Sequence, residues 1–127
     1  MTITDARLAI SEVAVATGLS THTLRYYERA GLMRDPVDRA SSSHRRYTEA
    51  DIGWVSFLTK LRTTAMPIAT VREYAELVRE GDSSIPARYE LLKRHREVVA
   101  AQLEEVTRSL AAIDYKIATY EDKAGKL

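Results

Sequence analysis

The chain has 127 residues, of which 45% are hydrophobic and 29% charged, and its formal net charge is only +1. It contains no cysteine, which excludes disulfides, thiolate metal sites and thiol redox chemistry, and which fits a reducing cytoplasm. No apolar run approaches the length of a membrane span, and the first ten residues lack the basic start and apolar stretch of a signal peptide.

The first two predicted elements are short helices separated by a tight turn. Ser11 is a candidate N-cap for the first helix, and Gly18 ends it. Ser20 then caps a second helix, which begins at Thr21 and ends at Gly31. A glycine-containing turn of about three residues between two helices is typical of a helix-turn-helix.

The second helix, within "STHTLRYYERAGL", is poor in aliphatic residues. Leu24 is its only large aliphatic residue before Leu32, whereas two adjacent tyrosines and several charges fill the rest. We expect Leu24 to anchor this helix in the core. The remaining side chains predict an outer face that meets a partner.

The following segment predicts a small hairpin or wing. Pro36, Asp38 and the serines at 41–43 form a turn-rich loop, and the flanking strings "LMR" and "RRYT" are short enough to be its strands. Residues 20–47 contain six arginines against three acidic residues, a local charge of +3. The planar guanidinium group suits phosphate and guanine edges, so this region favours nucleic acid as a partner.

Two amphipathic helices are predicted next. Thr48 and Asp51 form a capping box at the start of one, and Pro67 opens the other, which ends at Gly81. Apolar residues recur at helical spacing along each: Ile52, Val55, Leu58 and Leu61, then Ile68, Val71, Ala75 and Val78.

A long helix from about residue 85 to about residue 122 completes the pattern, and its apolar residues alternate by three and four as in a coiled coil. One set is Leu92, Val99, Val106, Ile113 and Tyr120, and the interleaved set is Arg96, Leu103, Leu110 and Ile117. We expect this seam to form a homodimer, because closed two-fold dimers are the commonest oligomers. Pairing with a different protein is the alternative. The flanking residues carry no regular charge code, so the sequence leaves the strand orientation open.

The strings "ISEVAVATGLSTHTLRYYERAGLM", "SHRRYTEADI" and "FLTKLRTTAMPIATVREY" resemble the MerR family of bacterial transcription regulators. The resemblance implies a mainly α-helical fold. Residues 1–80 would be a winged helix-turn-helix domain, and residues 81–127 a dimerisation helix that forms an antiparallel coiled coil. The chain departs from the family pattern before the fourth helix, where Ala65, Met66 and Pro67 replace a glycine and a bulky apolar residue.

The layout is most similar to the aldehyde-responsive subgroup, whose members carry a cysteine at the position that aligns with Lys60. Its absence excludes thiol-adduct and thiolate metal sensing. His22, His44 and His95 lack metal-ligand spacing, so we expect neither a metal site nor a cofactor.

The helix-turn-helix pattern and the resemblance together give three sets of candidate site residues. The predicted DNA contacts are Ser20, Thr21, His22, Thr23, Arg25, Tyr26 and Tyr27 in the second helix, and Arg45, Arg46 and Tyr47 in the wing. The predicted dimer contacts are Leu92, Val99, Leu103, Val106, Leu110, Ile113, Ile117 and Tyr120. Trp54, Tyr74, Tyr89 and His95 are candidates for an effector pocket, although a core position is the more favoured reading of Trp54.

The resulting hypothesis is a cytoplasmic homodimer that binds a pseudo-palindromic operator in double-stranded promoter DNA. By resemblance, it would distort an over-long promoter spacer for RNA polymerase, under the control of a possible small-molecule effector. An enzyme is disfavoured because no catalytic triad, phosphate loop or metal motif is present. An architectural DNA-binding protein or a coiled-coil adaptor, acting without an effector, remains the alternative. The operator, the effector and the sign of regulation stay open.

Overall fold

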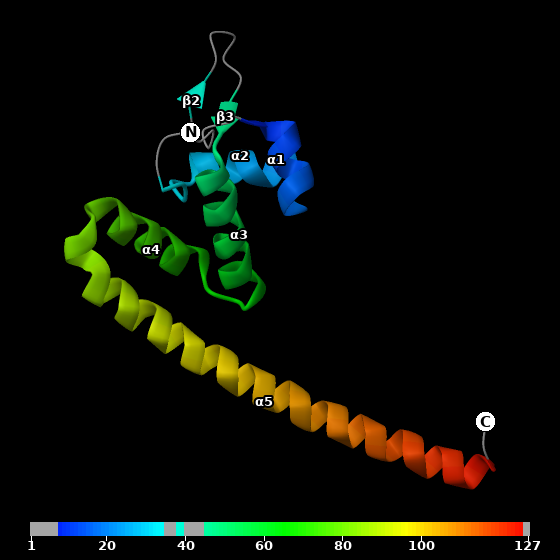
Figure 1. Cartoon of the computed structure of the whole chain (residues 1–127). Helices are drawn as coiled ribbons and strands as arrows, with labels where there is room; N and C mark the ends of the chain where they lie inside the picture. Colours follow the sequence, from blue (N-terminus) through cyan, green and yellow to red (C-terminus); the bar gives the residue numbers. More distant parts are fainter. Residues whose placement is uncertain (1–7, 35–37, 40–44, 126–127) are drawn as a thin grey trace, which may run out of the picture. The chain divides into compact units, whose positions relative to one another are not determined.

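The computed structural model describes residues 8–34, 38–39 and 45–125, and Figure 1 shows the order of its elements. The elements are β1 (Leu8–Ala9), α1 (Ile10–Thr17), α2 (Thr21–Arg29), β2 (Asp38–Arg39), β3 (Arg45–Tyr47), α3 (Glu49–Thr63), α4 (Ile68–Glu80), the 3-10 turn η1 (Asp82–Ser84) and α5 (Ile85–Ala124). The predicted fold class is confirmed, because a helix pair, a small sheet and two further helices precede one long C-terminal helix.

Helix α1 begins earlier than its sequence suggests. Its first residue is Ile10, so Ser11 lies inside the first turn and the predicted Ser11 cap is wrong. The backbone N–H of Ala9 instead donates to Glu12 Oε1 at 2.7 Å, which ties the preceding residue to the first turn of the helix. Gly18 ends the helix with a left-handed φ of 76°, as predicted.

Both predicted ends of α2 are confirmed. Ser20 Oγ accepts a hydrogen bond from the backbone N–H of Thr23 at 3.0 Å. At the other end Gly31 has a φ of 74°, and the N–H of Leu32 donates back to Tyr27 O at 3.0 Å. Helix α2 is therefore fixed at each end by contacts that its own sequence supplies.

The wing is a three-stranded antiparallel sheet with the order β1-β3-β2. Strand β3 pairs with β1 through Leu8 and Tyr47, and with β2 through Arg39 and Arg45. The "RRYT" prediction is confirmed by β3, but the strand predicted at "LMR" is wrong. These residues form no strand, and the side chains of Leu32 and Met33 are buried in the core. The serine-rich loop at 41–43 lies outside the described residues.

The connection between α3 and α4 contains an alanine in a left-handed conformation. Ala65 has a φ of 72°, and the N–H of Met66 donates to Leu61 O at 2.9 Å, which ends α3 as a glycine usually does. The Arg62 side chain donates to Met66 O at 2.6 Å, and the Met66 side chain is buried. These contacts hold an alanine in a backbone conformation that favours glycine.

The core of the helix-turn-helix region joins all of its elements. The capping box predicted at the start of α3 is present, with Thr48 and Asp51 exchanging hydrogen bonds of 2.9 and 3.2 Å. The side chains with almost no exposed surface are Val13, Leu24, Leu32, Tyr47, Val55, Leu58, Met66 and Val71. Burial of these side chains stabilises a core around α1, whose backbone lies close to those of α2, α3, β1 and β3.

The chain divides into two compact units, Met1–Tyr89 and Glu90–Leu127, so α5 starts in the first and continues through the second. In the second unit the predicted seam is exposed from Leu103 onward, with Leu103 65%, Leu110 56% and Ile117 51% accessible, whereas Leu92 and Val99 are half-buried. None of the helices in the described ranges combines the length and the apolarity needed to cross a membrane.

Candidate nucleic-acid interface

Helix α2 presents one polar, exposed face. His22, Arg25, Tyr26 and Arg29 are exposed, with Tyr26 at 40%, and both His22 and Arg29 are three or four residues from each of the adjacent pair Arg25 and Tyr26. This spacing puts their side chains on one side of a helix. Arg29 was absent from the predicted contacts, although its distance of seven residues from His22 already places it on this face. We call these four residues the α2 outer face.

The start of α2 is organised by two hydroxyl side chains. Ser20 Oγ and Thr23 Oγ1 lie 3.0 Å apart in a hydrogen bond, and Ser20 also caps the helix. Thr21 and Thr23 are half-buried, whereas Ser20 is exposed. All three were predicted DNA contacts, and the structure places them beside the α2 outer face as its N-terminal rim.

The two adjacent tyrosines have different surroundings. Tyr27 is only 6% exposed and packs inward together with Leu24, while Tyr26 belongs to the α2 outer face. Their rings are tilted by 57° with centroids 6.3 Å apart. Tyr27 therefore anchors the helix, and Tyr26 is the tyrosine that a ligand of this face can touch.

A wing residue joins the sheet to α2. The Tyr47 hydroxyl on β3 donates a hydrogen bond to the Glu28 carboxylate, and the Tyr47 side chain has no exposed surface. Tyr47 was predicted to contact DNA, but a buried ring cannot reach DNA from this position, so its role is to connect strand and helix. The backbones of Arg45 and Arg46 pair in the sheet, and their side chains lie outside the described part of the chain.

Four successive backbone carbonyls follow α2, in residues 30–33, and each accepts a hydrogen bond from a side chain of α3 or α4. Trp54 Nε1 donates to Leu32 O at 2.8 Å. Arg72 and Arg79 of α4 donate to the other three carbonyls. The two arginines were not among the predicted site residues, and no local sequence pattern points to these contacts.

The predicted effector residues are brought together only in part. The Trp54 and Tyr74 rings stack with centroids 5.7 Å apart and an interplanar angle of 9°, and Phe57 tilts onto Tyr74 at 5.9 Å. Trp54 is 9% exposed, which favours a structural position in the core over a role in an effector pocket. Burial raises the pKa of Tyr74 above its ordinary value, and the positive charge of Arg88 opposes part of this rise.

The two other effector candidates lie on α5. Tyr89 is 60% exposed at the end of the first unit, and His95 is half-buried in the second unit. Within the described residues, no three histidine, cysteine or acidic side chains are grouped so that they could hold a metal ion.

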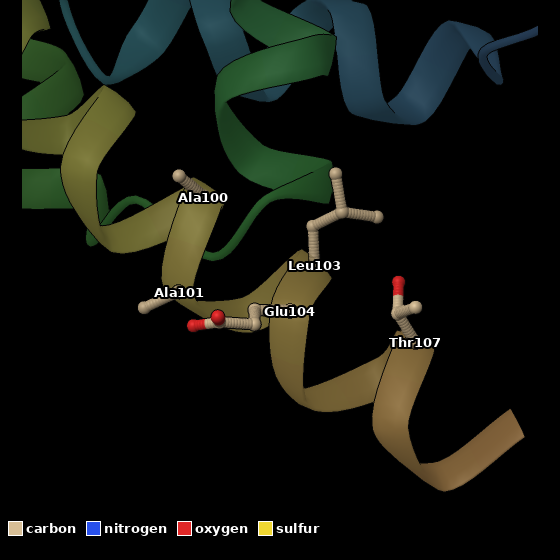
Figure 2. A pocket seen from close by; sticks show the side chains of 5 residues that line it. All are labelled: Ala100, Ala101, Leu103, Glu104 and Thr107. Carbon is tan, nitrogen blue, oxygen red and sulfur yellow. The ribbon is translucent and has the colours of Figure 1, made fainter. Parts of the chain in front are cut away.

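A shallow hollow lies on α5 itself, lined by Ala100, Ala101, Leu103, Glu104 and Thr107 (Figure 2). Ala100, Leu103 and Thr107 project to one side of the helix, and the other two project to another. Of these five residues, only Leu103 belongs to the predicted seam, so the hollow lies along the flank of that seam.

Residues 8–77 match the family described as "MerR HTH family regulatory protein". A Haemophilus influenzae protein named as an uncharacterized HTH-type transcriptional regulator is 34% identical over 121 residues, which cover 95% of this chain and 85% of the relative. A MerR family regulator from Listeria monocytogenes has a TM-score of 0.84 at 34% identity, covering 90% of this chain and 86% of that one.

A second similar structure was solved with bound DNA. It is HiNmlR, described as a MerR family regulator lacking the sensor domain and bound to promoter DNA. Its TM-score is 0.85 at 31% identity, over 95% of this chain and 97% of that one. With the helix-turn-helix, the wing and the long C-terminal helix already in place, these similarities show that the chain belongs to the MerR family of helix-turn-helix regulatory proteins.

Proposed function

We propose that this protein is a sequence-specific transcriptional regulator that inserts the α2 outer face into the major groove of promoter DNA. The observation that carries this proposal is the face itself. It gathers His22, Arg25, Tyr26 and Arg29 on a helix that is capped at both ends and anchored from behind. The promoter DNA bound by a solved relative of similar length supports the same partner class.

The residues of this face suit different parts of a duplex. N-terminal residues of a recognition helix approach base edges, so Thr21, His22 and Arg25 are the proposed base readers. Arg25 can form a bidentate pair with a guanine. Tyr26 and Arg29 lie farther along the helix and are proposed to contact phosphates, which set register rather than sequence.

The wing supplies the second half of the proposed contact. Arg45 and Arg46 lie on β3, which is joined to α2 through Tyr47 and Glu28. Their guanidinium groups are proposed to bind the sugar-phosphate backbone beside the recognition helix.

Dimerisation is proposed to occur through α5. Its seam exposes Leu103, Val106, Leu110, Ile113 and Ile117 in the single chain, each at least half accessible. Burying each such side chain in a partner helix contributes roughly 1.5–3 kcal/mol. The spacing of these residues by three and four supports a helix as the partner, and a second copy brings two DNA-reading domains to a pseudo-palindrome.

The proposed regulatory step is a distortion of promoter DNA. A dimer that bends and untwists an over-long spacer aligns the promoter elements for RNA polymerase, and the cost of deformation, several kcal/mol, is offset by added backbone contacts. A small-molecule effector would act by favouring one dimer conformation over the other. Such a regulator would act in the cytoplasm.

A footprint on the DNA upstream of the gene tests the proposal. We expect one protected near-palindrome within a long promoter spacer. Tandem or sequence-indifferent protection would instead support the alternative, an architectural protein that needs no effector. Circularly permuted fragments of the protected DNA then measure the bend, and an unbent complex would contradict the distortion.

The dimer is tested by the doubly substituted variant Leu103→Lys, Leu110→Lys. Two charges in the seam should yield a monomer in analytical ultracentrifugation, because each buried lysine would lack a partner. The matched control is Ala101→Lys with Ala112→Lys, which adds the same charges off the seam and should remain a dimer. If the seam variant stays dimeric, the assignment of α5 is wrong.

A further inference from the structure

The C-terminal end of the recognition helix is held by two side chains of α4. Arg72 Nε donates to Ala30 O at 2.9 Å. Arg79 Nη1 donates to Met33 O at 2.6 Å and to Gly31 O at 3.3 Å. Ala30 is the C-cap residue of α2, and Gly31 and Met33 lie just beyond it, so the accepting carbonyls belong to the segment that leaves the helix. Carbonyls of the last helical turn already accept from the backbone N–H groups of residues 30–32. The two guanidinium groups therefore hold the exit of α2, and they place positive charge near the negative end of its dipole.

These arginines connect two helices whose backbones do not touch. No Cα atom of α4 lies within 8 Å of a Cα atom of α2, and both helices are described in full. Arg72 and Arg79 are seven residues, or about two helical turns, apart, so they extend from the same side of α4. Val71 and Ala75 lie beside the two arginines around the helix and are buried in the core, so apolar packing fixes α4 next to the side from which the arginines extend.

We propose that Arg72 and Arg79 are positioning residues for DNA reading. They transmit the position of α4 to the recognition helix, and they set the angle at which the α2 outer face meets the groove. Neither arginine needs to touch DNA for this role. The inference rests on the proposed function, because it concerns how accurately the base readers at the start of α2 are placed.

This role predicts a loss of discrimination rather than a general loss of binding. Releasing the far end of α2 disturbs base contacts that depend on geometry, whereas phosphate contacts tolerate small rotations. A purely structural role would instead lower the thermal midpoint and weaken all DNA binding in parallel.

The chain contains a matched control. Arg62 Nη1 donates to Met66 O at 2.6 Å, the same distance as in the contact between Arg79 and Met33. Both arginines are exposed. Replacement of either by glutamine removes one positive charge and its hydrogen bonding to backbone carbonyls, one bond for Arg62 and two for Arg79. Only Arg79 contacts the segment that follows the recognition helix.

The experiment compares full-length parent, R72Q, R79Q, R79K and R62Q on two duplexes. One duplex is selected by the parent from a randomised library, and the other has the same bases in shuffled order. Fluorescence anisotropy at one fixed salt concentration gives the ratio of the two affinities, and circular dichroism gives each thermal midpoint.

We expect the ratio to fall about tenfold in R72Q and R79Q, the equivalent of one lost base contact. It should stay within about twofold of the parental ratio in R62Q, and within about threefold in R79K, whose ammonium still donates. If R72Q does not fold, R79Q and R79K test the positioning role, because Arg79 is exposed and its replacement leaves the core intact. If the parent discriminates between the two duplexes and R72Q and R79Q keep its affinity ratio, the positioning role is wrong and the proposed function stands. A parent that selects no sequence would overturn the proposed function, and the positioning role would fall with it.

Discussion

The Tyr47 hydroxyl donates a hydrogen bond to the Glu28 carboxylate, and this contact joins the wing to the recognition helix. The two residues are separated by 19 positions in the chain, and the tyrosine ring is fully buried. This polar contact at the edge of the core thus helps to hold the two parts of the proposed interface together. A charged acceptor makes such a contact stronger than a neutral hydrogen bond.

Tyr47→Phe should lower the free energy of unfolding by about 1.5 kcal/mol, since the substitution keeps the ring and removes only a hydrogen bond to a charged group. Urea denaturation at fixed protein concentration measures the change. Tyr115→Phe removes the same hydroxyl from an exposed ring on α5 that lies off the predicted seam, and it should have no effect. Equal stability of Tyr47→Phe and the parent would show that the contact contributes nothing.

Ala65→Gly should stabilise the protein by about 0.5–1 kcal/mol. Ala65 has a φ of 72°, where a Cβ atom is strained, and glycine relieves this strain at some cost in unfolded-state entropy. Thermal unfolding provides the measurement. The opposite sign is expected for Ala111→Gly within α5, because glycine destabilises a helix interior by about 1 kcal/mol. A loss of stability in Ala65→Gly would contradict this explanation of the α3–α4 turn.

Gly53→Ala should also be stabilising, by about 0.5–1 kcal/mol. Gly53 is exposed in the interior of α3, and a Cβ atom built there meets no heavy atom within 4 Å. Alanine therefore gains helix propensity without a clash. Urea denaturation of the variant, at the same protein concentration as the parent, gives the value, and a lower midpoint would mean that the position is more constrained than its open surroundings indicate.

Stability above about pH 10 should depend on Tyr74. Burial raises the pKa of this phenol above its ordinary value of 10.0, and Arg88 lowers it to a smaller extent. Between the unfolded and folded pKa values, only the unfolded state has lost the proton. The contribution of Tyr74 to stability is therefore complete below the unfolded pKa and is lost as the pH rises through the folded pKa.

Tyr74→Phe should accordingly lose less stability than the parent between pH values of about 9 and about 11. Urea midpoints across this range measure the difference. Tyr115→Phe, an exposed position, should retain the parental slope. Parallel slopes for the parent and Tyr74→Phe would contradict the raised pKa.

Much of the fold was predictable because the decisive signals are local. Ser20 and Gly31 bound α2, and Thr48 with Asp51 starts α3, through contacts that span a few residues. The same holds for the α2 outer face, whose spacing identifies Arg29 once the helix is known. Local patterns could also mislead, since Ser11 looks like a cap but lies within α1.

What the sequence did not reveal depends on distant partners. Strand β1 has only two residues, and it exists because Leu8 pairs with Tyr47. Leu32 was assigned to a strand, but it is buried while its carbonyl accepts from Trp54, 22 residues away. The contact between Arg72 and Ala30 spans 42 residues. No periodicity or capping rule reaches across such separations.

The central claim is that the α2 outer face reads DNA sequence, and the affinity of Arg25→Ala for the parent-selected duplex tests it most directly. Arg94→Ala, an exposed arginine on α5, is the matched control for the lost charge. At one fixed salt concentration, Arg25→Ala should bind the selected duplex at least about tenfold more weakly, with little change on the shuffled duplex, while Arg94→Ala behaves as the parent. Parental affinity of Arg25→Ala for the selected duplex would contradict the account.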